Sequence, residues 1–79
     1  MEKLPYERIR NLRIDADLSQ KQIAEYLHIS QNTYSQYEIG TLRFPLEAIV
    51  RLAELFHTSI DYLVGLTDEK KPYPRKKSY

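Results

Sequence analysis

The sequence contains no cysteine, only two glycines and no long apolar run. Without cysteine there can be no disulfide framework, no thiol nucleophile and no zinc site built on thiolates, so packing alone must stabilise the fold. No stretch is apolar and long enough to span a membrane or to serve as a signal peptide, which predicts a cytoplasmic protein with no membrane partner. With 79 residues the chain can form one small core but not a large enclosed substrate cavity.

Signals of catalysis and metal binding are also missing. The two histidines, His28 and His57, lie in different segments, without a cysteine or a carboxylate at the spacing of metal ligands. No serine lies between glycines in a nucleophile elbow, and no glycine-rich loop could cradle a phosphate. We therefore expect a protein that is not an enzyme and that has no catalytic residue, no metal and no cofactor.

The formal net charge of +1 is distributed unevenly along the chain. Residues 1–66 carry seven basic and nine acidic side chains, a net charge of −2, whereas residues 67–79 carry five basic and two acidic ones, a net charge of +3. The second segment also has two prolines and no aliphatic side chain, so it is predicted to be a flexible basic tail after a domain of residues 1–66. Because the domain itself is acidic, nucleic-acid binding would have to depend on individual side chains.

Apolar residues recur at helical spacing in five segments, and no strand alternation is visible. The predicted helices cover residues 6–15, 20–27, 31–39, 45–56 and 60–64. The fourth has the strongest apolar pattern and is expected to form the centre of the core. Tyr34 and Tyr37, three residues apart on the third helix, are interpreted as core residues.

Short polar residues and glycines mark the ends of these helices. Ser19 and Gln22 have the spacing of a capping box at the start of the second helix, and Ser30 is a favourable N-cap for the third. Gly40 and Gly65 follow the third and fifth helices, where a left-handed residue commonly ends a helix.

The second and third predicted helices are separated only by residues 28–30. So tight a connection forces the two helices to cross at a large angle, and the third helix then protrudes from the domain. A protruding helix fits the major groove of DNA, where the amides of Gln31, Asn32 and Gln36 could each form two hydrogen bonds with adenine. This pair of helices is therefore the candidate functional unit.

A further pattern extends over most of the chain. It consists of the segments Leu18-Ser19-Gln20, Ile23-Ala24, Ile29-Ser30, Thr33-Tyr34-Ser35-Gln36-Tyr37-Glu38, Gly40, Leu52-Ala53 and Asp61-Tyr62-Leu63. Taken in this order, these segments make residues 6–65 resemble the phage-repressor-like helix-turn-helix family, of the lambda repressor and Cro type. The resemblance implies an all-α fold, namely a compact five-helix DNA-binding domain that contains a helix-turn-helix.

The resemblance also implies roles for particular residues. The third helix of this family reads DNA bases, which assigns base contacts to Gln31, Asn32 and Gln36. Contacts with the DNA backbone are assigned to Ser19, Gln20, Lys21, Thr33, Ser35 and Arg43. Arg13 and Glu38 occupy positions at which the family often ties the first helix to the end of the third, so we expect a structural ion pair between them.

The function implied is that of a sequence-specific double-stranded DNA-binding transcriptional regulator, a repressor that acts as a dimer on a palindromic operator. One short recognition helix makes few base contacts, so we expect a weak homodimer on half-sites one helical turn, about 34 Å, apart. The candidate dimer contacts are His57, Thr58, Ile60 and Tyr62.

Two positions depart from the family pattern. His28 replaces the usual glycine of the turn and must adopt a positive φ angle. Ile39 replaces a polar residue before Gly40 and is expected to be exposed or to face a partner. Two other functions stay open at this point: an antitoxin-type DNA-binding protein with a toxin partner, and a protein-interaction module on the same fold, which the negative net charge of residues 1–66 favours.

Overall fold

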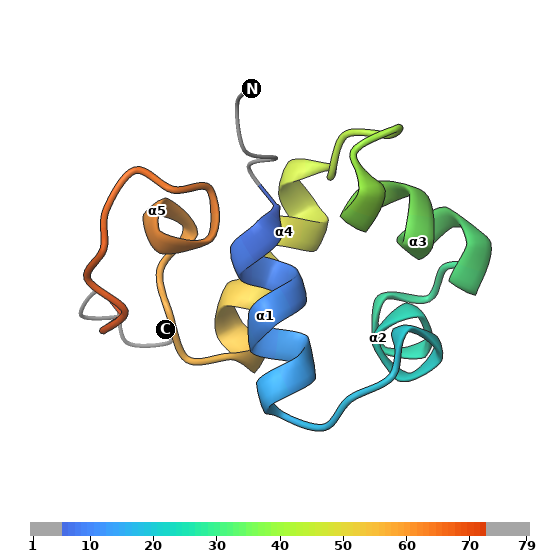
Figure 1. Cartoon of the computed structure of the whole chain (residues 1–79), viewed down its shortest axis with the longest axis horizontal. Helices are drawn as coiled ribbons and strands as arrows, with labels where there is room; N and C mark the ends of the chain where they lie inside the picture. Colours follow the sequence, from blue (N-terminus) through green and yellow to red (C-terminus); the bar gives the residue numbers. More distant parts are fainter. Residues whose placement is uncertain (1–5, 73–79) are drawn as a thin grey trace, which may run out of the picture.

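The computed structural model describes residues 6–72 of the chain, which contain five α-helices and no strand (Figure 1). The helices are α1 (Glu7–Asp15), α2 (Gln20–Leu27), α3 (Gln31–Ile39), α4 (Leu46–Leu55) and α5 (Ile60–Leu63). The predicted all-α five-helix architecture is confirmed. Within residues 6–72 no helix has the length and apolar composition needed to cross a membrane.

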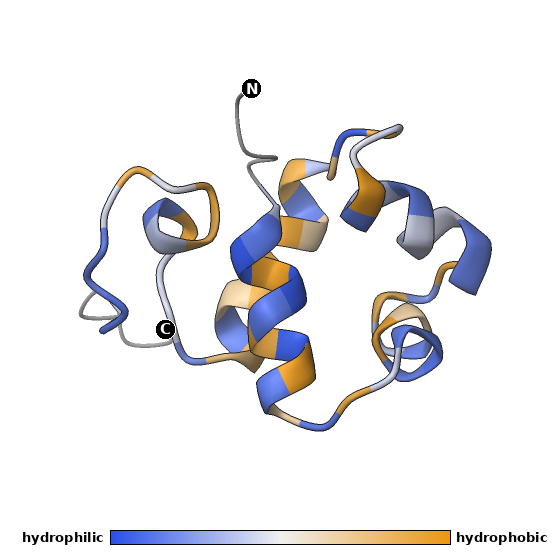
Figure 2. Ribbon diagram, in the orientation of Figure 1, coloured by the Kyte–Doolittle hydropathy of each residue, from blue (hydrophilic) through white to orange (hydrophobic). Residues whose placement is uncertain are grey.

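The helices pack around α1, which lies at the centre of Figure 1 with α2 and α3 on one side and α5 on the other. Helix α2 packs against α3, α4 packs against α5, and α1 contacts both α3 and α5. Hydrophobic and hydrophilic residues alternate along α1 and α4, whereas α3 is mainly hydrophilic except at its C-terminal end (Figure 2). The helix that is assigned to DNA is therefore mainly polar, as expected for a helix with a large solvent-exposed face.

Side-chain caps start three of the helices. The Ser19 hydroxyl accepts a hydrogen bond from the backbone N–H of Gln22, whose side chain accepts one from the Ser19 N–H, so the predicted capping box is confirmed. Ser30 and Ser59 cap α3 and α5 with a single hydrogen bond each: their hydroxyls accept from the backbone N–H groups of Thr33 and Tyr62. Pro45, the first residue of the predicted fourth helix, lies at the N-cap of α4, one residue before the helix begins.

One type of C-terminal turn ends four of the five helices. After α2, the N–H of Ile29 bonds to the carbonyl of Ala24 and the N–H of His28 to that of Glu25, the pattern of a Schellman motif. The same two bonds follow α1, α4 and α5. The left-handed residue is Gly65 only after α5; the other three are non-glycine residues, namely Asp17, His28 and His57, with φ angles of 58°, 60° and 52°.

Glycine at one of these positions is expected to stabilise the fold. In His57→Gly the loss of left-handed strain, about 1–2 kcal/mol for a residue with a β-carbon, exceeds the entropy cost of glycine in the unfolded chain, about 0.5–1 kcal/mol. Thermal unfolding should therefore show a gain of about 0.5–1 kcal/mol, or a few degrees in a domain of this size. His57→Ala, which keeps the β-carbon, is the matched control, and an equal gain in that variant would refute the explanation.

The core is built from apolar residues of all five helices and from one residue of a loop. Ile9, Ile23, Tyr34, Leu52 and Leu63 are its most deeply buried large side chains, one from each helix. Tyr34 is thus a core residue as predicted, while Tyr37 is only partly buried and packs against the same core.

The loop residue in the core is Phe44, between α3 and α4, which the helical pattern alone did not identify. It is 6% exposed, and its ring lies 4.7 Å from the Tyr6 ring, 4.9 Å from the Tyr37 ring and 6.0 Å from the Tyr34 ring, between centroids. Edge-on and tilted contacts of this kind are favourable for aromatic rings. Phe44 therefore anchors the loop that carries Arg43 to the C-terminal half of α3.

The residues after α5 contact the body of the domain. The Arg8 guanidinium on α1 donates to the backbone carbonyls of Tyr62, at 3.2 Å, and Thr67, and pairs with the carboxylate of Asp68. The Thr58 hydroxyl donates to the carbonyl of Lys70 at 2.7 Å. Three residues of the predicted basic tail, Thr67, Asp68 and Lys70, thus contact the domain. The last part of that tail, residues 73–79, lies outside the described residues.

Candidate nucleic-acid interface

The helix-turn-helix consists of α2, residues 28–30 and α3. His28 adopts the left-handed conformation with φ 60° and ψ 42°, which confirms the positive φ expected where the family has glycine. Ser30 is extended, with φ −74° and ψ 152°, and its side chain caps α3 by accepting from the Thr33 N–H. Because α2 and α3 pack against each other, the turn and the cap together fix the direction in which α3 projects.

The predicted base-reading residues lie on the first two turns of α3. Gln31 and Asn32 are exposed, and Gln36, one turn further along, is half-buried. Thr33 and Ser35 are also half-buried, and the Thr33 hydroxyl lies 2.9 Å from that of Ser30 within the N-terminal cap. The helix therefore presents its amides at the surface, while Tyr34 and Glu38, one turn apart on its other face, enter the core.

The residues assigned to the DNA backbone are in two places. Ser19, Gln20 and Lys21 lie at the start of α2, where Ser19 is the N-cap and Lys21 is exposed. Arg43 is exposed on the loop between α3 and α4. Ile39, at the end of α3, is 59% exposed, in agreement with the expectation for this position.

A buried carboxylate joins α1, α2 and α3. The Glu38 side chain is 3% exposed and that of Arg13 is 12% exposed, and Arg13 Nε lies 2.7 Å from Glu38 Oε2 while Nη2 lies 3.2 Å from Oε1. Arg13 and Glu38 therefore form a bidentate ion pair. Two further donors, which nothing in the sequence pattern predicted, complete the site: the Tyr34 hydroxyl, 2.6 Å from Oε2, and Gln20 Nε2, 3.0 Å from Oε1.

This arrangement keeps Glu38 ionised despite its burial. Burial raises the pKa of the Glu38 carboxyl, but the hydrogen bonds from Arg13, Tyr34 and Gln20 lower it by more, so the pKa lies below its ordinary value. The hydrogen bond with Glu38 raises the pKa of Arg13, and burial together with the same carboxylate raises the pKa of Tyr34. The ion pair is therefore charged, and Tyr34 is neutral, throughout the physiological range.

The lowered pKa of Glu38 makes the free energy of unfolding depend on pH in the acid range. Because the folded carboxyl binds a proton less tightly than the unfolded one, its contribution is complete above the unfolded pKa, about 4.3, and is lost as the pH falls through the lower folded pKa. Urea unfolding from pH 7 to pH 3 should show this loss in the wild type. Glu38→Gln, which has no proton to bind at this position, should have a flatter profile; parallel profiles for the two proteins would contradict the assignment.

The predicted dimer contacts differ in accessibility. His57 is exposed, Ile60 and Tyr62 are half-buried, and the Arg8 guanidinium lies 4.4 Å from the centroid of the Tyr62 ring. Thr58 is 2% exposed, and its hydroxyl donates to the Lys70 carbonyl. Thr58 is therefore the least accessible of the four candidate dimer contacts in this conformation.

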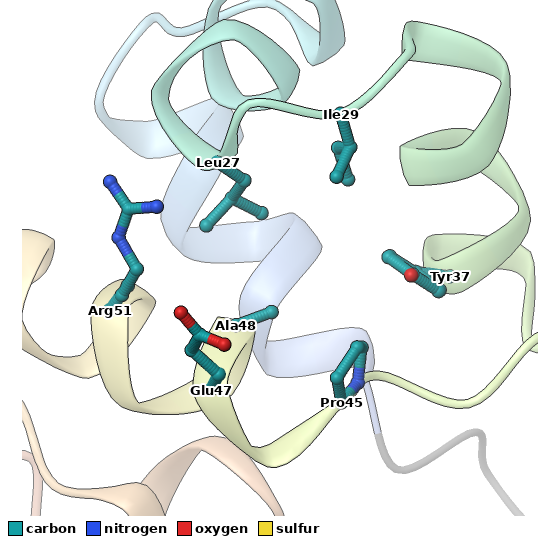
Figure 3. A pocket seen from close by; sticks show the side chains of 7 residues that line it. All are labelled: Leu27, Ile29, Tyr37, Pro45, Glu47, Ala48 and Arg51. Atoms are coloured by element: carbon teal, nitrogen blue, oxygen red, sulfur yellow. The ribbon is translucent and has the colours of Figure 1, made fainter.

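A small pocket lies between the turn and the start of α4. Its volume is about 140 Å³, and its lining comes from the turn region, α3 and α4, namely Leu27, Ile29, Tyr37, Pro45, Glu47, Ala48 and Arg51 (Figure 3). The Arg51 side chain extends toward α2, where its guanidinium donates to the Tyr26 carbonyl at 2.7 Å. Sites for small organic ligands are larger, about 300–1,000 Å³, and none of the predicted DNA contacts lines this pocket.

Comparison with known proteins identifies the class. A family model described as helix-turn-helix matches residues 9–63, so the chain belongs to the helix-turn-helix family, and the resemblance noted in the sequence is confirmed. No solved structure matches the chain at the significance that the curated relatives reach.

Two curated relatives from Bacillus subtilis match most of the chain. The uncharacterised HTH-type transcriptional regulator YobD is 38% identical over 72 residues, which cover 91% of this chain and 64% of the relative. The HTH-type transcriptional regulator AnsR is 38% identical over 69 residues, which cover 87% of this chain and 60% of the relative.

A third relative is a phage protein. The cryptic phage CTXphi transcriptional repressor RstR of Vibrio cholerae is 39% identical over 58 residues, which cover 73% of this chain and 52% of the relative. The chain thus spans between about half and two thirds of the length of the curated relatives it matches.

Proposed function

We propose that this protein is a sequence-specific double-stranded DNA-binding transcriptional regulator, and that it acts as a repressor by binding a palindromic operator as a dimer. The observation that carries the proposal is the placement of Gln31 and Asn32, exposed on the first turn of a helix whose other end is locked into the core. Membership of the helix-turn-helix family and relatives named as transcriptional regulators, one of them a repressor, support it.

In this mechanism α3 enters the major groove with its N-terminal turns leading. The amides of Gln31, Asn32 and Gln36 bond to base edges and select the sequence, because an amide can both donate to and accept from adenine. The backbone contacts fix the register of the protein on the duplex and come from Ser19, Gln20, Lys21, Thr33, Ser35 and Arg43. Bound at a promoter, the domain represses transcription by occupying the site.

The charge distribution limits how the domain can bind. Residues 1–66 have a net charge of −2, so general attraction to DNA is weak and the few cations at the interface, Lys21 and Arg43, must neutralise phosphates locally. Affinity then depends on summing two half-sites, which is the reason to propose a dimer. The accessible members of the predicted dimer contacts are His57, Ile60 and Tyr62.

Selection of bound duplexes from a randomised DNA pool, at about 0.1 M salt, tests the proposal in one experiment. We expect enrichment of a motif with two-fold symmetry and half-sites one helical turn, about 34 Å, apart. An enriched motif without symmetry would keep the base-reading function and overturn the dimer. No enrichment at all would overturn the proposed function and direct the search to a protein partner.

A further inference from the structure

Gln20 connects the surface assigned to DNA with a buried charge. Its side chain is half-exposed at the first position of α2, and its Nε2 donates to Glu38 Oε1 at 3.0 Å. Glu38 lies on α3 and its side chain is 3% exposed. The hydrogen bond therefore crosses between the two helices of the helix-turn-helix, from a residue that faces solvent to one that does not.

The charge of Glu38 determines which way the Gln20 amide points. A glutamine amide has two N–H donors on nitrogen and only acceptors on oxygen, whereas an ionised carboxylate only accepts. With the amide reversed, the Gln20 carbonyl oxygen would lie against Glu38 Oε1 and repel it. The nitrogen is thus held toward Glu38, and its second N–H is left for another acceptor.

The other partners of Glu38 keep the carboxylate in place. Arg13 Nε and the Tyr34 hydroxyl both bond to Oε2, at 2.7 and 2.6 Å, and Arg13 Nη2 reaches Oε1 at 3.2 Å. Arg13 also donates to the Leu18 carbonyl at 2.8 Å, just before the cap of α2. With these three hydrogen bonds from α1 and α3, the carboxylate has little freedom to turn away from Gln20.

We propose that Glu38 is a positioning residue for DNA binding, because its carboxylate holds Gln20 with one N–H free for a phosphate of the DNA backbone. This inference rests on the proposed function and assigns a role to a residue that does not itself touch DNA. A glutamine already held in one rotamer and one amide orientation loses less conformational entropy when it binds than a freely rotating one does. A phosphate, which has only acceptors, suits the N–H that remains.

A double-mutant cycle on the operator obtained by selection tests the coupling. Gln20→Ala and Glu38→Gln should each weaken binding about tenfold, the value of one charge-assisted hydrogen bond. Because Glu38 acts through Gln20, the double variant should bind within about threefold of the weaker single variant. If the double variant instead lost the product of the two single losses, about a hundredfold in affinity, the inference would be overturned while the proposed function stayed intact.

Lys21→Ala is the matched control, because Lys21 is the next residue of α2 and its side chain is exposed without a bond to Glu38. In a variant that combines Lys21→Ala with Glu38→Gln, the loss of affinity should be the product of the two single losses. A second readout uses operators in which a single phosphate is replaced by a neutral methylphosphonate. One such replacement should weaken the wild type yet leave the Gln20→Ala and Glu38→Gln variants unaffected, a pattern that a general loss of stability would not give.

Glu38→Gln leaves Arg13 without its counter-ion, so the wild type supplies a measurement that needs no variant. In NMR spectra one of the two Gln20 Nε2 protons should be shifted, by its bond to Glu38, away from the position seen for exposed glutamines, and both should move as Glu38 takes up a proton in acid. Signals at the positions of exposed glutamines that do not respond to this titration would overturn the inference. Failure of the wild type to bind any selected duplex would overturn the proposed function and the inference with it.

Discussion

Replacing Glu38 with alanine is expected to lower the free energy of unfolding by about 3–5 kcal/mol, the usual cost of removing one partner from a buried ion pair. The reason is that Arg13, with a side chain 12% exposed, keeps its charge but loses the carboxylate that neutralises it. Tyr34 loses the acceptor of its hydroxyl inside the core at the same time. Urea unfolding followed by circular dichroism at pH 7 measures the change.

The control for this experiment is Glu25→Ala, which removes an exposed carboxylate of α2 and should change stability by less than about 0.5 kcal/mol. Since small domains are stable by only about 5–15 kcal/mol, Glu38→Ala is expected to be partly unfolded at physiological temperature. A decrease in the free energy of unfolding below about 1 kcal/mol, the range of exposed ion pairs, would show that Glu38 and its hydrogen-bond partners add little to stability.

The second large effect concerns DNA. A variant with Gln31, Asn32 and Gln36 all changed to alanine should lose at least about a thousandfold in affinity for the selected operator, because specific binding by such domains exceeds non-specific binding by about 10³–10⁷. Its affinity for a scrambled duplex should change little. Fluorescence anisotropy with both duplexes at the same salt concentration gives the ratio.

The same variant should remain folded. Alanine has a higher helix propensity than asparagine or glutamine, and two of the three side chains are exposed. An unchanged preference for the operator over the scrambled duplex, in a protein that unfolds normally, would mean that α3 does not read the bases. The DNA contact would then have to be sought on another surface.

The features that sequence analysis predicted correctly are those set by neighbouring residues. The capping box of Ser19 and Gln22 and the N-cap at Ser30 depend on interactions within three residues, so a local pattern is sufficient. The length of each helix followed from the same signals to within about two residues. The left-handed His28 was expected only because the family has glycine at this position. The Arg13–Glu38 contact is not local; only the family resemblance suggested it.

What was missed depends on contacts between distant segments. Phe44 lies in a loop and has no helical spacing to mark it, and only the folded chain brings Tyr6 and Tyr37 against it. The hydrogen bond from Gln20 to Glu38 joins two polar residues; in the sequence the first resembles a surface amide and the second one partner of an ion pair. Only apolar residues recur at the spacing of a buried helix face, so the spacing of polar residues does not predict which of them pair.

The contacts of Arg8 have a consequence for the order of folding. They join residues 54 to 60 positions apart, near the two ends of the domain, whereas α2 and α3 are neighbours in the chain. Closing so long a loop costs conformational entropy, so these contacts are expected to form only after other contacts have brought the two ends of the domain together. We therefore expect the helix-turn-helix to form early and the seam between α1 and residues 67–70 to close last, and that seam should be the first part of the described structure to open in native-state hydrogen exchange.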